Sequence, residues 1–127
     1  MKKRVKVSAL LMVGMLISAA TFAQSAEKIA GKWYAEEVDK SVIKIYKAKN
    51  GHWYGKIIES ADEEKVDHLL LDKIVYDEDK EALTSTLKAT NGMNVKATLT
   101  LVDAQTLKIV GRKMLMSKTF IWKKQAP

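Results

Sequence analysis

The sequence predicts an all-β fold of about eight antiparallel strands, arranged as an up-and-down barrel or a strongly curled sheet. Apolar and polar residues alternate with a period of two through most of the chain, as half-buried strands require. Short polar breaks, including two Asn-Gly pairs, separate these segments, and connections this short join antiparallel neighbours. Closing such a sheet buries its single apolar face and removes exposed strand edges.

Three strands are expected early in the predicted domain, at 32–38, 42–48 and 53–58. Asp39 and Lys40 form the polar break after the first strand, and Asn50-Gly51 follows the second. Because Asn and Gly readily adopt positive φ, this pair predicts a tight hairpin turn. Gly55 lies inside the third strand and indicates a bend there.

The segment 60–79 does not follow the strand pattern throughout. It begins with a possible capping box from Ser60 to Glu63, and its first turn is acidic. Val66, Leu69 and Leu70 then recur at helical spacing. The sequence therefore predicts one short helix or loop at about 61–70, followed by a strand at about 72–77.

The remaining strands alternate clearly. They are expected at 82–88, 96–102, 106–112 and 118–123. In the clearest case, Ala97, Leu99 and Leu101 share one face, while Lys96 and Thr98 share the other. Such segments predict one buried and one solvated face of the sheet.

The first 23 residues are predicted to be a cleavable signal peptide. A basic leader, MKKRVK, precedes an apolar run, and Thr21-Phe22-Ala23 offers the small residues that a signal peptidase reads. An uncleaved membrane anchor is the alternative, but the apolar run is interrupted by glycine and shorter than the roughly 20 residues of a spanning helix. We therefore expect an exported protein, periplasmic or secreted, with a single domain at 24–127.

The charge, the cysteine content and the outer-face residues of the predicted domain argue against several classes of function. Four basic residues belong to the leader, so residues 24–127 hold 18 basic and 15 acidic residues, a net charge of +3. This small excess predicts no nucleic-acid partner. The chain has no cysteine, so its stability is expected to come from burial and hydrogen bonds. The outer strand faces carry Lys, Thr and Glu, which suits water rather than the lipid contact of an outer-membrane barrel.

Several motifs occur in a familiar order along the predicted domain. They are Gly31-Lys32-Trp33, Gly51-His52-Trp53-Tyr54-Gly55-Lys56-Ile57, Thr106-Leu107-Lys108-Ile109-Val110-Gly111 and Thr119-Phe120-Ile121-Trp122-Lys123. Their order resembles the exported bacterial domain-of-unknown-function family 2147, over nearly all of the predicted domain. It is also similar to the calycins, among them the lipocalins, which open with G-x-W and lay a basic residue of the last strand against that tryptophan. The resemblance implies a calycin-like small barrel and export, but no particular activity.

Trp33 is the first large ring of the predicted barrel. It could form a stacking surface in a ligand cavity, but we favour a structural plug at the closed end of the barrel. In that interpretation Lys123 or Arg112 covers its ring through a cation–π contact.

A small hydrophobic or amphipathic ligand is the leading functional hypothesis. The predicted ligand-binding residues are Trp53, Arg112, Met114, Met116, Phe120 and Trp122. Met114 and Met116 flank the last hairpin tip and could adapt to an apolar ligand, whereas Arg112 could hold an anionic headgroup. The same tip could instead fold back onto the core, and Arg112 could be a surface residue.

The alternative is a cell-envelope interaction or inhibitor module with a filled barrel, which would present the hairpin tip and the acidic segment 61–67 to a protein. Catalysis is not expected, because His52 and His68 are the only histidines and no serine lies in a nucleophile-elbow context. An enzyme built from loop carboxylates is the third hypothesis. The sequence predicts no metal site and no cofactor.

Overall fold

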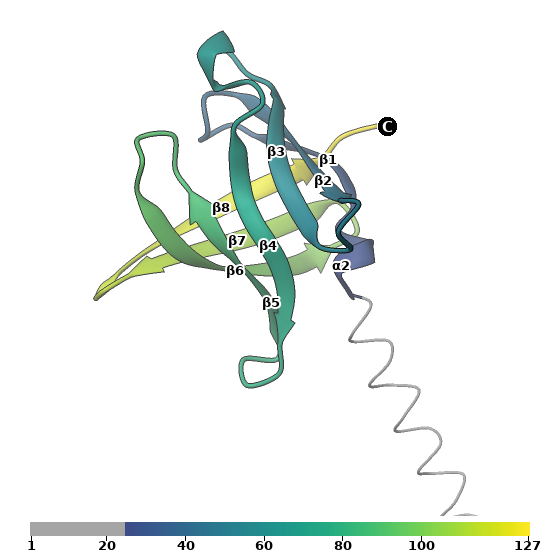
Figure 1. Cartoon of the computed structure of the whole chain (residues 1–127), viewed down its shortest axis with the longest axis vertical. Helices are drawn as coiled ribbons and strands as arrows, with labels where there is room; N and C mark the ends of the chain where they lie inside the picture. The colour runs from purple at the N-terminus through teal and green to yellow at the C-terminus, as the bar shows by residue number, and fades with distance from the viewer. Residues whose placement is uncertain (1–24) are drawn as a thin grey trace, which may run out of the picture.

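The alternating segments form eight strands that close into a barrel (Figure 1). The computed structural model describes residues 25–127, so the predicted signal peptide at 1–23 lies outside the described residues. The elements are α2 (Ser25–Lys28), β1 (Gly31–Ala35), β2 (Ser41–Lys47), β3 (Trp53–Glu59), the 3-10 helix η1 (Glu63–Lys65), β4 (Leu69–Asp77), β5 (Ala82–Lys88), β6 (Asn94–Asp103), β7 (Thr106–Lys113) and β8 (Met116–Lys124). Each strand is antiparallel to the next, and β1 also pairs with β8. The predicted up-and-down barrel is confirmed.

The barrel has two different ends, because successive connections of an up-and-down barrel alternate between them. The closed end holds α2 and the connections β2–β3, β4–β5 and β6–β7. Ala26 and Ile29 are buried in the core there, and the indole Nε1 of Trp33 donates a 2.8 Å hydrogen bond to the carbonyl of Ile29. The open end holds the other four connections, which Figure 1 shows at the left and top of the barrel.

Apolar side chains fill the barrel interior. Trp33, Ile43, Ile57, Leu71 and Ile109 are fully buried, and each lies on the inward face of its strand. Gly55 lies opposite Leu71 in the pairing of β3 with β4, where the register shifts on both sides of the glycine. A Cβ at Gly55 would lie 3.0 Å from Cδ1 of Leu71, so the absence of a side chain lets Leu71 pack against the backbone.

The seam between β1 and β8 corrects the predicted partner of Trp33. Lys124, not Lys123 or Arg112, covers the Trp33 ring, with its Nζ 4.7 Å from the ring centroid. Lys123 instead donates a 3.2 Å hydrogen bond from Nζ to Oγ1 of Thr106. The reason is the strand period of two: Trp122 points inward, so Lys124 shares its face and Lys123 points outward.

The segment after β3 also differs from the prediction. The helical turn is limited to η1, and β4 begins at Leu69 because Lys56 of β3 and Leu87 of β5 pair with its first residues. The capping box was assigned to the wrong residue. Asp62 caps η1 by accepting a hydrogen bond from the amide of Glu64, whereas Ser60 Oγ accepts one from the amide of Asp62.

Candidate functional site

An apolar pocket of about 700 Å³ opens between the β5–β6 and β7–β8 hairpins, at the open end of the barrel. Its floor is formed by Leu87, Val95, Gly111 and Phe120. These residues continue the inward-facing rows of β5, β6, β7 and β8 beyond the last filled layer of the core. A Cβ at Gly111 would lie 3.3 Å from Cγ2 of Val95, so the glycine lets these two strands line the floor closely.

The rim of the pocket is apolar and open to solvent. Met114 and Leu115 form the two-residue turn of the β7–β8 hairpin, and Met116 begins β8. Their side chains are 90%, 104% and 78% exposed, and Met93 in the β5–β6 connection is 46% exposed. The pocket therefore lies between a solvent-accessible apolar tip and the buried core.

Two lysines provide the charge at this pocket. Lys113 and Lys118 are both exposed and belong to its lining. The Nζ of Lys118 lies 5.1 Å from the centroid of the Phe120 ring, a cation–π contact that holds the ammonium group at the rim. No acidic residue lines the pocket. An apolar floor with cationic groups at its edge suits an amphipathic molecule with an anionic head.

The structure brings some of the predicted ligand-binding residues together and separates others. Met114, Met116 and Phe120 line the pocket. Trp122 lies one inward-facing position deeper and is 1% exposed, and its buried Nε1 has no hydrogen-bond partner within residues 25–127. Trp53 is half-buried at the start of β3, at the closed end, and does not reach the pocket.

Arg112 does not line this pocket, so its predicted role as the headgroup partner there is corrected. Gly111 and Lys113 face the pocket, and strand alternation turns Arg112 to the outer face. It lines a separate groove of about 350 Å³ with Lys80, Lys96, Thr98 and Val110. Lys113 and Lys118 occupy the position that was predicted for Arg112.

Sequence reasoning did not identify the pocket lysines. Lys118 and Phe120 are two positions apart in a strand, as are Gly111 and Lys113. Strand alternation places each pair on one face, so this spacing was a usable signal. Met93 and the β5–β6 connection gave no such signal, because their approach to the β7–β8 hairpin depends on how the barrel closes.

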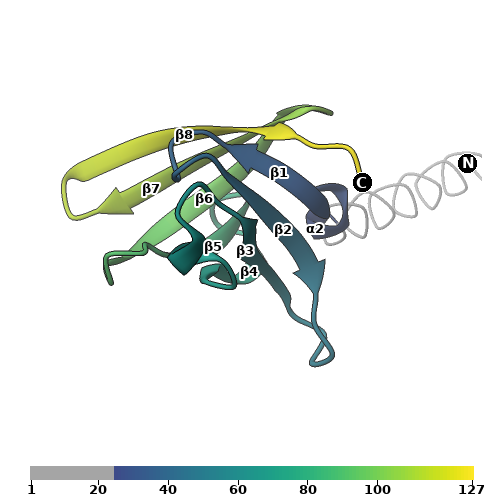
Figure 2. The same cartoon turned by 90° about the horizontal axis from the view of Figure 1, so that it is seen from above.

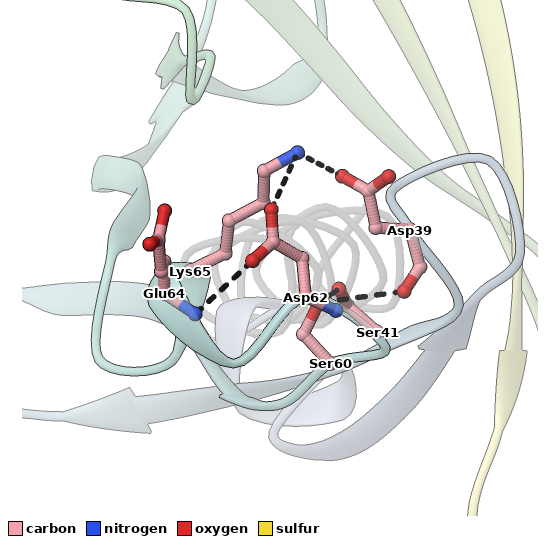
Figure 3. Close-up of polar contacts among 6 residues, drawn as sticks. All are labelled: Asp39, Ser41, Ser60, Asp62, Glu64 and Lys65. Carbon is pink, nitrogen blue, oxygen red and sulfur yellow. Dashed lines mark hydrogen bonds and ion pairs between the residues drawn. The ribbon is translucent and has the colours of Figure 1, made fainter.

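A cluster of polar contacts joins the β1–β2 connection to the β3–β4 connection at the open end (Figure 3). Ser41 Oγ donates a 2.9 Å hydrogen bond to Ser60 Oγ, and Lys65 forms ion pairs with Asp39 and with Asp62, the latter at 3.8 Å. The hydrogen bond to Asp39 raises the pKa of Lys65 above its ordinary value. These contacts fasten the β1–β2 connection to the segment before β4. The cluster is internally paired and therefore has a structural role.

Groups that could support metal binding or acid–base chemistry are dispersed. His52 lies in the β2–β3 turn, whereas His68 Nε2 lies 2.6 Å from the carbonyl oxygen of Lys88. Among residues 25–127, no group of three histidine, cysteine or carboxylate side chains is arranged to hold a metal ion. Within the same range, no helix is long and apolar enough to cross a membrane.

Comparisons with known proteins gave no relative. No family model matches the chain, and no curated protein and no solved structure is significantly similar to it. The function of the pocket must therefore be inferred from its geometry and chemistry.

Proposed function

We propose that this protein binds a small amphipathic ligand, with an apolar body and an anionic head, in the pocket at the open end. The observation that carries the proposal is the pocket itself: about 700 Å³, with an apolar floor and two lysines at its edge. Pockets of about 300–1,000 Å³ lined by apolar side chains are typical of small-molecule sites. The apolar body would lie on Phe120 and Val95, and the head would contact Lys113 and Lys118.

The proposed setting is outside the cytoplasm, periplasmic or secreted. Its support is the leader sequence of residues 1–23, with its basic start, apolar run and small residues at the cleavage position. Membership of the exported family 2147 is likewise a proposal, which rests on the order of the quoted motifs. No catalytic role is proposed.

The experiment uses 1-anilinonaphthalene-8-sulfonate (ANS), an anionic fluorescent probe, with laurate as the competitor. Ala89 lines the pocket, so Ala89→Trp should fill it and lower ANS affinity by about tenfold, since the apolar contacts of the probe would be lost. Thr90→Trp adds the same ring at an exposed position outside the lining and should leave affinity unchanged. Equal affinities for wild type and Ala89→Trp would refute the site.

The lysines provide a second test. Lys113→Gln and Lys118→Gln should each weaken laurate binding by about twofold to fivefold, the range expected for an exposed charge pair. Lys108→Gln, on the outer face of β7, is the matched control. A neutral competitor, dodecanol, should bind all three variants as well as wild type. Equal losses for laurate and dodecanol would show that the lysines do not contact the head.

A protein partner is the second candidate, and the exposed tip favours it. Met114, Leu115 and Met116 leave apolar surface in solvent, and the interior below the pocket is filled. In this alternative the barrel would act as an envelope interaction or inhibitor module. Wild-type protein that binds neither ANS nor laurate would favour this function over ligand binding.

A further inference from the structure

The tip of the β7–β8 hairpin is a convex apolar surface. Figures 1 and 2 both show this hairpin projecting beyond the rest of the barrel. Its turn exposes almost the whole of Met114 and Leu115, and Met116 follows at 78% exposure. Three consecutive exposed apolar residues at one projection require an explanation, because isolated surface hydrophobics are ordinary but clusters mark contact sites.

The conformation of the turn strengthens this point. Met114 has φ of 56°, and it is the first central residue of a two-residue hairpin turn. Glycine is the usual residue at such a position, because side chains make positive φ unfavourable. The chain therefore has an apolar side chain where hairpin stability alone would favour glycine.

Charge is distributed unevenly between the two halves of the barrel. Residues 82–127 contain eight basic residues and one acidic residue, Asp103, so their formal net charge is +7. Residues 25–81 contain ten basic and fourteen acidic residues, a net charge of −4. The wall formed by β5 to β8 is thus basic. Arg112, Lys113 and Lys118 flank the apolar tip, and no acidic residue occurs between 104 and 127.

The acidic residues of the open-end connections belong to β1–β2 and β3–β4, with Glu36, Glu37 and Asp39 in the first and Asp62, Glu63, Glu64 and Asp67 in the second. Asp62, Glu63 and Glu64 belong to η1 or its cap, and Asp39 is tied to this segment by Lys65. Figure 1 shows η1 at the top of the barrel and the β7–β8 tip at the far left. An anionic surface could therefore approach the hairpin tip without meeting the acidic segment.

We propose that the β7–β8 tip docks onto an anionic lipid bilayer, with Met114, Leu115 and Met116 inserted into its interface. Arg112, Lys113 and Lys118 would lie at the level of the lipid phosphates. A bilayer fits because it accepts a convex apolar projection, whereas a protein would need a matching groove. Apolar residues at the interface and basic residues behind them are the two components of such binding. Docking would also bring the pocket rim to the membrane, where amphiphiles reside.

The proposal is tested by co-sedimentation with lipid vesicles. The protein is expressed from the full chain and used in its folded form. Wild type should bind vesicles of phosphatidylcholine mixed with phosphatidylglycerol, and bind pure phosphatidylcholine at least tenfold more weakly. Leu115→Ser with Met116→Ser should lower partitioning to the anionic vesicles by about tenfold or more. Lys113→Gln with Lys118→Gln should lower it by about tenfold or more and should reduce its sensitivity to salt.

Val102→Ser is the matched control, because Val102 is 59% exposed near the closed end of β6. It should bind like wild type, and circular dichroism should show all variants folded. Equal binding to neutral and anionic vesicles, or an unchanged Leu115→Ser/Met116→Ser variant, would overturn the proposal. The proposal would also be overturned if wild type binds no vesicles but forms a dimer, and if Leu115→Ser/Met116→Ser dissociates that dimer.

Docking and ligand binding can fail independently. Ala89→Trp fills the pocket and keeps Met114, Leu115 and Met116 in the tip, so it should keep vesicle binding while losing ANS affinity. Loss of vesicle binding in Ala89→Trp would show that the pocket, and not the tip, holds the lipid, and would overturn tip docking.

Discussion

The side chain of Lys124 covers the ring of Trp33 and reaches the backbone of Ala30, which precedes β1. Its Nζ lies 4.7 Å from the centroid of the Trp33 ring and donates a 2.6 Å hydrogen bond to the carbonyl of Ala30. Gly31, with φ of 115°, leaves room for this contact: a Cβ there would lie 2.9 Å from Nζ. In the spacing Gly31-x-Trp33, Trp33 thus supplies an aromatic ring to the core. Gly31 leaves the space that Lys124 needs to cover that ring.

Loss of this contact should weaken the barrel. Lys124→Ala removes both the cation–π contact and the hydrogen bond, so we expect the free energy of unfolding to fall by about 1–2 kcal/mol. Lys123→Ala removes an outward-facing lysine and its hydrogen bond to Thr106 Oγ1, without any contact to the Trp33 ring, and should cost less, about 0.5 kcal/mol. Urea denaturation measures both. Similar losses for the two variants would contradict the assigned role of Lys124.

Ser60→Ala should leave a buried hydroxyl without its acceptor. Ser41 is 0% exposed, and its Oγ donates to Ser60 Oγ. We expect a loss of about 1–3 kcal/mol in thermal or urea unfolding, the usual cost of an unsatisfied buried polar group. Ser41→Ala combined with Ser60→Ala should recover part of that loss, because no hydroxyl then remains buried. If the double variant loses as much free energy of unfolding as the two single variants added together, this account would be contradicted.

Met114→Gly should stabilise the protein. Positive φ costs a non-glycine residue about 1–2 kcal/mol, which exceeds the roughly 0.5–1 kcal/mol of extra chain entropy that glycine loses on folding. A gain of about 0.5–1 kcal/mol is expected in urea denaturation. Ser117→Gly lies three residues away in β8 without positive φ, so it should destabilise instead. The prediction fails if both glycine variants lower stability.

Asp103 should make stability depend on pH in the acidic range. Hydrogen bonds from the backbone of Gln105 and the side chain of Thr106 lower the pKa of Asp103 below its ordinary 3.8. Since the folded pKa is the lower one, the ionised form stabilises the fold above that ordinary value, and the effect disappears as the pH falls through the folded pKa. Asp103→Asn keeps an acceptor for Gln105, so its unfolding free energy should vary less with pH there. Identical profiles for wild type and Asp103→Asn would contradict the assignment.

The period of two predicted the barrel because most strands alternate and most connections are short. The same period, applied consistently, places Lys124 rather than Lys123 on the face of Trp122. It also places Arg112 outside, because Ile109 is inside. Those two errors were therefore avoidable. The start of β4 at Leu69 was not, since local spacing favoured a helix and only pairing with β3 and β5 selects a strand.

The pocket was only partly predictable. Strand alternation gives the face of each residue, but the end of the barrel at which a residue lies follows from the topology. Trp53 faces the interior side of β3 and yet begins that strand at the closed end, far along the barrel axis from Phe120. Met93 meets the β7–β8 hairpin only because β6, which pairs with β5, also pairs with β7 in the closed sheet.

The Lys124 seam has a consequence for the biosynthesis of the protein. Lys124 and Ala30 are 94 positions apart, and among the described strands β1 pairs only with β2 and β8. Contacts between such distant residues form slowly, because a long loop must first be closed. The barrel cannot close until β8 has been synthesised, because β8 is the strand that pairs with β1 across the seam. The hairpins from β1 to β7 can pair as they emerge, so the β1–β8 seam is the last contact that completes the ring of strands.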